Sequence, residues 1–250
     1  DQGNTQYWMP ANAPYFEPIY HPFANATSVA EIEAYELPQI SDAELAWLHA
    51  EAQRLYETTD KAIMAQTGIT IYEAAQGLPG WEQFMVDLAE NPKIAQALLE
   101  KITTNAITNL TRYLNAVDEY IHIVQCGDDL GTQNGPQLSP RMYRNLIMPY
   151  QQQVYQRAKA LSGKPVFLHC CGGIYPLLPD LIEAGVDIIN PVQFTAAGMD
   201  PARLKREFGR DLVFWCGGAD TQHVLPNASP AEVREHVRAL IDIFAPGGGF

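Results

Sequence analysis

The sequence predicts an α/β fold, a parallel (β/α)8 or TIM barrel of which this chain holds about five strands. Short apolar runs recur along the chain, and a helix with its own capping signals follows nearly every one of them. Polar residues and glycines gather directly after these runs, where barrel enzymes carry their chemistry. No Gly-x-Gly-x-x-Gly follows any of the runs, which argues against a dinucleotide-binding doubly wound sheet.

Residues 1–60 are predicted to cover the barrel rather than to belong to it. Residues 1–24 are rich in proline and aromatic residues and have neither a helical nor a strand period. Ser41 and Glu44 then form a capping box, and apolar residues recur at helical spacing to about Thr59. We therefore expect an irregular segment followed by one helix.

Residues 61–250 are predicted to form the partial barrel domain. Its expected strands are residues 62–65, 120–124, 165–169, 186–190 and 212–216. Its expected helices begin at Gly80, Pro92, Ser139, Ile174, Pro201 and Pro230, and the one that starts at Ser139 is interrupted before Pro149. A strand, a polar strand end and a capped helix, repeated in this way, are typical of parallel βα units.

The chain is expected to be an internal piece of a longer enzyme. It has no initiator methionine, and its last predicted helix leads through Pro246 and a run of glycines to Phe250, which indicates a turn that enters another strand. About five strands leave two edges of a barrel unpaired, so we expect further βα units at both ends.

The charge balance limits the kinds of partner. The chain has 16 basic and 29 acidic residues, so it lacks the surplus of cations that nucleic acids or anionic membranes require. A small molecule or another protein is the expected partner. Four cysteines, two of them adjacent, do not form a disulfide framework in a chain of this length, and neither a signal peptide nor a long apolar run is present. These features predict a cytoplasmic protein that does not cross a membrane.

The strand 165–169 ends in the most distinctive motif of the chain, His169-Cys170-Cys171-Gly-Gly. Residues i and i+2 of a strand point to the same side, so His169 and Cys171 can aim an imidazole and a thiol at one point. Together they supply half of a tetrahedral zinc site. The structural alternative is a buried cysteine next to a histidine that caps a carbonyl group.

A catalytic zinc site needs a third protein ligand and an open position. Cys216 and Cys126 are the candidates for this ligand, because each lies at or beside the end of a predicted strand. Either cysteine could instead be a small core residue.

Other polar residues follow the strand ends. Asp128 and Asp129 are candidates for a general acid or base, or for binding a cationic or hydroxyl-bearing substrate, with helix or turn capping as the structural alternative. Asp220, next to Gly217 and Gly218, is a third catalytic candidate. The candidate substrate-binding residues are Gln133, Asn190, Gln193 and Glu73.

Several of these motifs, taken together, resemble the uroporphyrinogen decarboxylase superfamily over about residues 60–250. They are GDDLGTQ (127–133), SP (139–140), MPY (148–150), LHCCG (168–172), EAGVDIINPVQ (183–193), MDP (199–201) and FWCGGAD (214–220). The resemblance implies a (β/α)8 barrel with one of two activities. One is cofactor-free decarboxylation of uroporphyrinogen III, and the other is zinc-dependent methyl transfer between a corrinoid protein and a thiol or another acceptor.

The resemblance favours the methyltransferase branch. His169 and Cys171 are similar to the first two zinc ligands of that branch, which the decarboxylases lack. The third ligand of the family, a downstream cysteine, would lie beyond the glycine-rich turn at the end of this sequence. The implied cofactors and partners are Zn²⁺, a corrinoid carried by a partner protein, and a small-molecule substrate.

Two other interpretations stay open. A decarboxylase would use an aspartate such as Asp128 near the pyrrole nitrogens, but a substrate with eight carboxylates needs several cations, and the arginines of this chain fall largely in predicted helices. A barrel that binds a small molecule without catalysis would leave the cysteines as core residues. Several predicted strands end in polar residues, and this argues against a purely structural role, because burying polar groups costs free energy that packing alone does not recover.

Overall fold

The computed structural model describes residues 7–9, 11, 16–215 and 217–250. Its centre is a five-stranded sheet of β3 (Met64–Gln66), β4 (Ile123–Gly127), β7 (Val166–His169), β8 (Ile188–Asn190) and β9 (Val213–Phe214). The strands pair in chain order and every pair is parallel. The predicted fold class, an α/β fold built from parallel βα units of a barrel, is confirmed.

The strand bounds differ from those predicted by a few residues. The strand expected at 120–124 begins only at Ile123, because the turn Asp118–Tyr120 continues the preceding helix. The strand expected at 212–216 is described as Val213–Phe214, and Cys216 lies outside the described residues. Sequence periodicity locates apolar runs well, whereas their ends depend on neighbouring turns.

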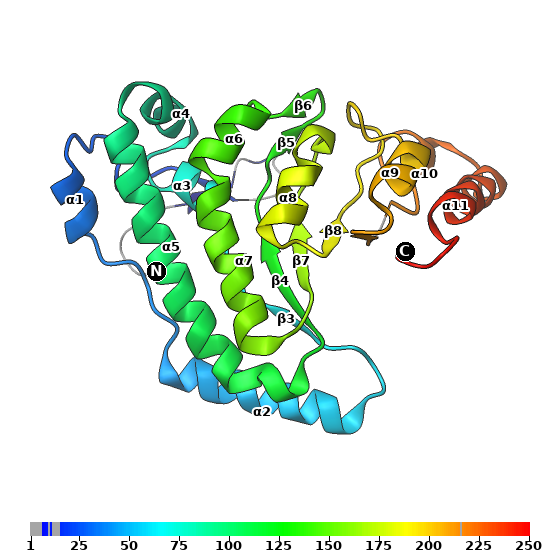
Figure 1. The fold of residues 1–250 in the computed structure, drawn as a ribbon, viewed down its shortest axis with the longest axis horizontal. Coiled ribbons are helices and arrows are strands. Elements are labelled where there is room, and N and C mark those ends of the chain that lie inside the picture. Colours follow the sequence, from blue (N-terminus) through cyan, green and yellow to red (C-terminus); the bar gives the residue numbers. More distant parts are fainter. Residues whose placement is uncertain (1–6, 10, 12–15, 216) are drawn as a thin grey trace.

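Helices cover one side of the sheet in Figure 1. Those in front of the strands in that view are α5 (Pro92–Val117), α7 (Met148–Ser162) and α8 (Leu178–Ala184). The other helices of the predicted barrel part are α3 (Tyr72–Gly77), α4 (Trp81–Glu90), α6 (Pro140–Leu146), α9 (Pro201–Phe208), α10 (Val224–Asn227) and α11 (Pro230–Phe244). The predicted interruption before Pro149 is confirmed, since α6 ends at Leu146 and α7 starts at Met148. The short helix α3 was not predicted.

Capping side chains begin several helices as the sequence indicated. Of the capping box predicted for Ser41 and Glu44, the described hydrogen bonds contain one half: Ser41 Oγ accepts the backbone N–H of Glu44 at the start of α2 (Asp42–Thr58). Ser139 Oγ accepts the backbone N–H of Met142. The full capping box is present at Ser229 and Glu232. Each such cap satisfies a backbone donor that the helix itself leaves free.

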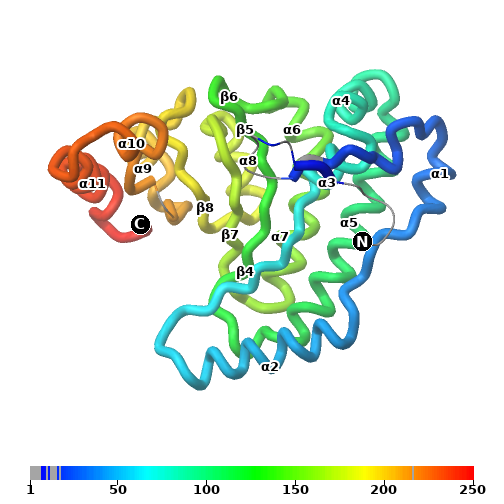
Figure 2. The backbone as a smooth tube through the Cα atoms, turned by 180° about the vertical axis from the view of Figure 1, so that it is seen from behind, coloured from blue at the N-terminus to red at the C-terminus, as the bar shows by residue number. Residues whose placement is uncertain are grey.

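The segment ahead of the barrel strands is less irregular than predicted. It contains a short antiparallel pair, β1 (Tyr7–Trp8) with β2 (Glu17–Pro18), and a helix α1 (Val29–Ala34) that the sequence did not predict. Both α1 and α2 pack against α5. Figures 1 and 2 show α2 crossing the end of the molecule opposite to the short hairpin of β5 (Gly131–Thr132) and β6 (Gly135–Pro136).

The residues after the last helix lie beside β9. Phe214 N–H donates to the carbonyl oxygen of Gly249 at 2.9 Å, and the Phe250 ring stacks on Phe244 with centroids 5.2 Å apart. The turn predicted after the last helix is present at residues 246–247.

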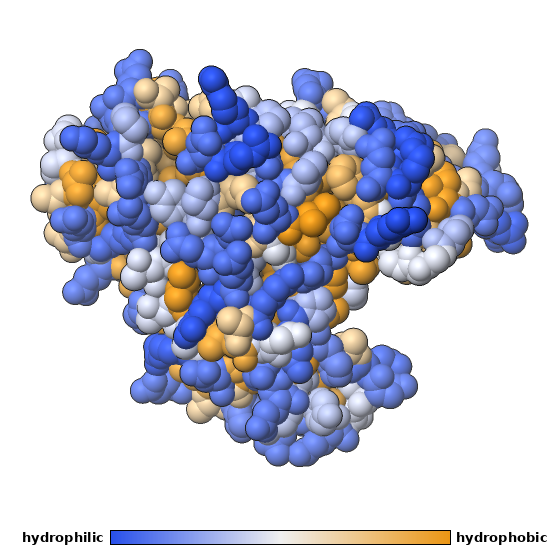
Figure 3. Space-filling model, viewed as in Figure 1, coloured by the Kyte–Doolittle hydropathy of each residue, from blue (hydrophilic) through white to orange (hydrophobic). Residues whose placement is uncertain are grey.

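The helical face seen in Figure 3 is mainly hydrophilic, with apolar atoms in small separate patches. In the described part of the chain, no helix combines the length and the apolar character needed to span a membrane.

Candidate metal centre at the strand ends

The parallel register brings the predicted site residues to one edge of the sheet. Gly127 at the end of β4 is opposite His169 at the end of β7, and His169 is opposite Asn190 at the end of β8. The residues that follow these positions therefore meet above the same edge, as the carboxyl ends of parallel strands do in barrels. Asp129, His169, Cys171 and Asn190 lie here.

Three of these side chains form a cluster. The potential ligand atoms of Asp129, His169 and Cys171 all lie within 4.8 Å of one another. His169 Nε2 is 3.5 Å from Cys171 Sγ, and Cys171 N–H donates to Asp129 Oδ1 at 2.7 Å. The expected convergence of imidazole and thiol is therefore present, and a carboxylate joins them. Asp129 was predicted as a catalytic residue, not as a metal ligand.

Asn190 determines which nitrogen of His169 faces the cluster. Its Nδ2 donates to the carbonyl oxygen of Trp215 at 3.0 Å, so its Oδ1 is the acceptor for His169 Nδ1 at 2.7 Å. His169 then carries its proton on Nδ1 and presents the lone pair of Nε2 toward Cys171. Metal-bound histidines are typically oriented by such a hydrogen bond. Asn190 was predicted to bind substrate, whereas in the structure it is the partner of His169.

The cluster suits zinc. One nitrogen, one sulfur and one oxygen donor are ligand types that Zn²⁺ accepts, and the separation of His169 Nε2 and Cys171 Sγ is compatible with two ligands of one tetrahedral ion. Burial and the charge of Asp129 raise the pKa of the Cys171 thiol to about 11. A bound divalent cation would oppose both effects, because it favours the thiolate.

Two other cysteines of the described part of the chain, Cys126 and Cys170, do not join this cluster. Cys126 is buried, its Sγ lies 3.9 Å from Thr67 Oγ1, and burial raises its pKa to about 12. Cys170 is also buried, and its Sγ accepts the backbone N–H of Leu130 at 3.3 Å. The alternative in which Cys126 is the third ligand is therefore wrong, since its thiol faces the core. The prediction for Cys216 lies outside the described residues.

Asp128 lies in the interior. Its side-chain oxygens accept the backbone N–H groups of Ile71 and Glu73 and the amide of Gln151, at distances of 2.8 to 3.0 Å. Gln151 was not predicted, because a polar residue within a helix gives no signal of burial. Burial raises the pKa of Asp128 to about 6, against these hydrogen bonds, which lower it. The contacts of Asp128 fix the first turn of α3, and a catalytic role for it stays a prediction.

Glu73 lies on that turn of α3, near the cluster. Its side chain is half-buried, and burial and the charges of Asp128 and Asp129 raise its pKa to about 7. Its predicted role in substrate binding is therefore compatible with its place.

The predicted substrate-binding glutamines bind each other. Gln193 Nε2 donates to Gln133 Oε1 at 2.9 Å, and Gln193 Oε1 accepts the N–H of Gly172 at 2.9 Å. Gln222 Nε2 also donates to Gln133 Oε1, at 3.3 Å. These amides, which we call the glutamine network (Gln133, Gln193 and Gln222), connect the loops that follow β4, β7, β8 and β9.

Asp220 holds its own loop together. Its Oδ1 accepts the N–H groups of Gln222 and His223, both at 2.8 Å, and its Oδ2 lies 3.2 Å from His223 Nδ1. The described hydrogen bonds of Asp220 do not reach the metal cluster, so the structure does not bring this predicted catalytic residue together with His169 and Cys171.

Two glycines allow the backbone of one loop to pass directly over another. A Cβ atom on Gly131 would lie 2.5 Å from the carbonyl oxygen of Cys171, and one on Gly172 would lie 2.4 Å from the carbonyl carbon of Gly131. Gly172 also has φ = +88°, which side chains disfavour. The glycines of both motifs are thus required for the close approach that positions Cys171.

The chain is similar in sequence to proteins of one known family. A family model described as uroporphyrinogen decarboxylase (URO-D) matches residues 13–250. Uroporphyrinogen decarboxylase from Crocosphaera subtropica and chloroplastic uroporphyrinogen decarboxylase 2 from Arabidopsis thaliana are each 31% identical to this chain over 121 residues, 48% of its length. The matches span 31% and 28%, respectively, of these relatives.

A solved methyltransferase from Methanosarcina mazei has a similar structure. Its TM-score is 0.69 with 14% sequence identity, and the match covers 98% of this chain and 67% of that one. At this identity the likeness concerns the fold alone.

Proposed function

Because the chain belongs to the uroporphyrinogen decarboxylase family, we propose that it acts in zinc-dependent methyl transfer between a corrinoid carried by a partner protein and a thiol or another small acceptor. The observation that carries this proposal is the cluster of Asp129, His169 and Cys171 at the strand ends. The methyltransferase from Methanosarcina mazei has a similar fold, which adds support.

The side chains of the cluster would hold zinc through His169 Nε2, Cys171 Sγ and a carboxylate oxygen of Asp129. A zinc ion bound there would supply Lewis acidity, which lowers the pKa of a thiol that binds to it. Asn190 keeps the proton of His169 on the nitrogen that faces away from Cys171. Asp129 anchors the backbone of Cys171, so the thiol stays beside the imidazole.

Decarboxylation of uroporphyrinogen is the second candidate, because both curated relatives carry that name. The surroundings of the cluster favour it less. The charged neighbours of Glu73 include Asp128 and Asp129, and a substrate with eight carboxylates would be repelled by them. Arg144 on α6 is not free to bind a carboxylate, because it is paired with Asp180 at 2.8 Å.

Metal analysis together with two activity assays tests the proposal. We expect purified protein to contain about one zinc per chain and the His169→Ala, Cys171→Ala double variant to contain almost none. Cys170→Ala is the matched control, because this neighbouring thiol points away from the cluster, and it should keep its zinc. Transfer of the methyl group from methylcobalamin to a thiol should depend on the metal. A protein without zinc that converts uroporphyrinogen would contradict the proposal and support the second candidate.

Asn190 provides a finer prediction about the same site. Asn190→Leu removes the acceptor for His169 Nδ1, so the imidazole loses its fixed tautomer and orientation. We expect zinc affinity, measured by competition with a chromogenic chelator, to fall by roughly 10-fold to 100-fold. Asn190→Asp keeps an acceptor and should retain most of the affinity. Equal losses in the two variants would show that packing, and not this hydrogen bond, is what matters.

A further inference from the structure

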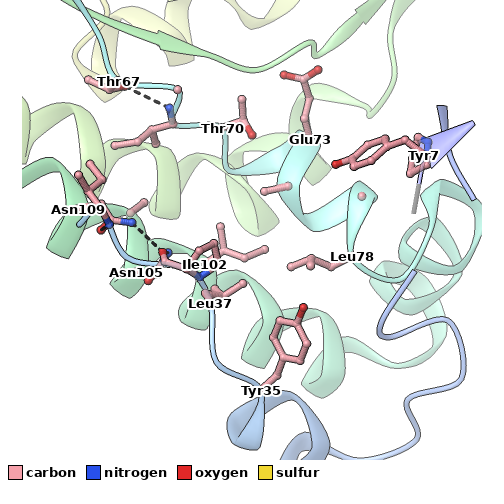
Figure 4. A pocket seen from close by; sticks show the side chains of 18 residues that line it. Tyr7, Tyr35, Leu37, Thr67, Thr70, Glu73, Leu78, Ile102, Asn105 and Asn109 are labelled. Carbon is pink, nitrogen blue, oxygen red and sulfur yellow. Dashed lines mark hydrogen bonds between the residues drawn. The ribbon is translucent and has the colours of Figure 1, made fainter. Parts of the chain in front are cut away.

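A cavity of about 580 Å³ has Glu73 in its lining, and the charges of Asp129 and His169 of the candidate metal centre act on the carboxyl group of Glu73. One wall is formed by the loop and helix that follow β3, and the other by α5 and residues 35–40 (Figure 4). Apolar side chains such as Leu37, Leu78 and Ile102 make up much of the lining. This volume is within the range of sites that hold small organic molecules, roughly 300 to 1,000 Å³.

Some polar groups of the lining hold the walls in place. The side-chain amides of Asn105 and Asn109 both donate to the carbonyl oxygen of Pro38, at 3.3 and 3.1 Å, and Asn109 Oδ1 accepts the N–H of Ile40 at 3.1 Å. Thr67 Oγ1 donates to the carbonyl oxygen of Gln125 at 2.7 Å. These groups are therefore used by the protein and give the cavity a fixed shape.

Thr70 Oγ1 and the carboxylate of Glu73 make no hydrogen bond to another described side chain of the lining. Figure 4 shows both residues on the wall opposite Tyr35 and Leu37. The Glu73 carboxylate meets one protein donor, the backbone N–H of Asp129, and a carboxylate has further acceptor positions for a ligand. The backbone of Glu73 is fixed, because its N–H donates to Asp128 at 3.0 Å. Asp128 directly precedes Asp129 of the metal cluster, so Glu73 connects the cavity with that cluster.

The charge of the lining limits the ligand. The 18 residues that line the cavity include no lysine, arginine or histidine, and one of them, Glu73, is acidic. An anionic molecule would find no cation here and would face a carboxylate, which makes its desolvation costly. An uncharged molecule with an apolar body would bury that body and direct one hydroxyl or thiol hydrogen toward Glu73.

We propose that this cavity binds the small substrate, and that the substrate is an uncharged, mainly apolar molecule with one hydroxyl or thiol group placed between Thr70 and Glu73. The assignment as substrate rests on the proposed function, in which the sulfur or oxygen of this molecule takes the methyl group from the corrinoid, so that the cobalt–carbon bond breaks and the thiol or hydroxyl proton is released. The binding of such a molecule rests on the cavity alone.

Isothermal titration of the full chain with matched probes tests the proposal. The probes are 2-phenylethanethiol, 2-phenylethanol, ethylbenzene and 3-phenylpropanoate. We expect 2-phenylethanethiol and 2-phenylethanol to bind at least about tenfold more tightly than 3-phenylpropanoate, because the carboxylate of 3-phenylpropanoate would meet no cation in the lining. Ala74→Phe fills the cavity from α3 and should weaken binding of the thiol by at least about tenfold. Ala50→Phe, at an exposed position of α2 outside the lining, should leave binding within about twofold of the wild type.

A second variant keeps the test decisive if Ala74→Phe does not fold. Thr70→Val retains the shape and removes the hydroxyl, so binding of 2-phenylethanol should weaken while binding of ethylbenzene stays the same. The titrations are repeated with the His169→Ala, Cys171→Ala protein. Binding that persists there while zinc is lost supports the cavity even if methyl transfer is not found. Absence of binding by all the probes, or equal binding of 3-phenylpropanoate, would overturn the proposal.

Discussion

Gly172→Ala is expected to destabilise the protein by about 3 kcal/mol or more and to abolish zinc binding. The added Cβ would lie 2.4 Å from the carbonyl carbon of Gly131 and 2.6 Å from the backbone nitrogen of Thr132. Backbone atoms cannot turn aside as a flexible side chain can, so the two loops must separate. Because Gly172 follows Cys171, this separation would move the thiol away from His169.

Gly163→Ala is the matched control for this variant. Gly163 also has a positive φ, +64°, but nothing lies within 4 Å of the position that its added Cβ would take. The free energy of unfolding of Gly163→Ala should therefore fall only by the cost of a positive φ for alanine, roughly 1 to 2 kcal/mol, and the variant should keep its zinc. Chemical unfolding followed by circular dichroism measures the stabilities, and elemental analysis measures the metal. Similar losses in both variants would mean that the positive φ, and not the contact between the loops, explains the effect.

Asp128→Ala should cost a similar amount, roughly 3 kcal/mol near pH 8. The substitution leaves the backbone donors of Ile71 and Glu73 and the amide of Gln151 without their acceptor inside the protein. Asp128→Asn should fall between the wild type and Asp128→Ala. It still offers an oxygen to the backbone donors, but its NH₂ group would face the NH₂ group of Gln151, whose oxygen already accepts from Tyr143.

The loss in Asp128→Ala should also depend on pH. Burial raises the pKa of Asp128 to about 6 in the folded protein, above its ordinary value of 3.8. The folded state then binds a proton more tightly than the unfolded state, so the wild type gains stability from this group as the pH falls from 7 to 4. The alanine variant lacks this gain, and the difference between the two proteins should widen over that range. Gln153→Ala, which removes an exposed side chain without an ionisable group, should show no such trend. A constant difference for Asp128→Ala would contradict the raised pKa.

Sequence patterns predicted the order of the elements better than the partners of polar side chains. Alternating strand and helix signals identified the parallel units, and the i, i+2 spacing of His169 and Cys171 identified two members of the cluster. These signals are local, because they depend on backbone geometry that repeats every few residues. The helix α3 has no periodic pattern in the sequence. Its first turn is held by Asp128, a residue more than fifty positions later in the chain, and no local pattern contains that contact.

The role of each polar residue depends on contacts that no local pattern contains. Asp128 and Asp129 are adjacent and equally acidic, yet one is buried under α3 and the other lies beside Cys171. Gln133 and Gln193 had the same predicted role as Asn190, but the first two bind each other and Asn190 binds His169. Consecutive residues at a strand end point in different directions. A shift of one position in the sequence therefore separates a side chain that is buried in the core from one that faces the candidate site.

The glutamine network gives the loops an attachment that does not depend on ionic strength. Its groups are neutral amides, whereas the acidic residues, which outnumber the basic ones by 29 to 16, carry charges whose interactions at the surface weaken as salt is added. Salt can therefore change how this protein meets a charged partner while the loops that carry Cys171 stay joined. Association and the internal geometry of the site then respond to different conditions, so a cell or an experimenter can vary the first without disturbing the second.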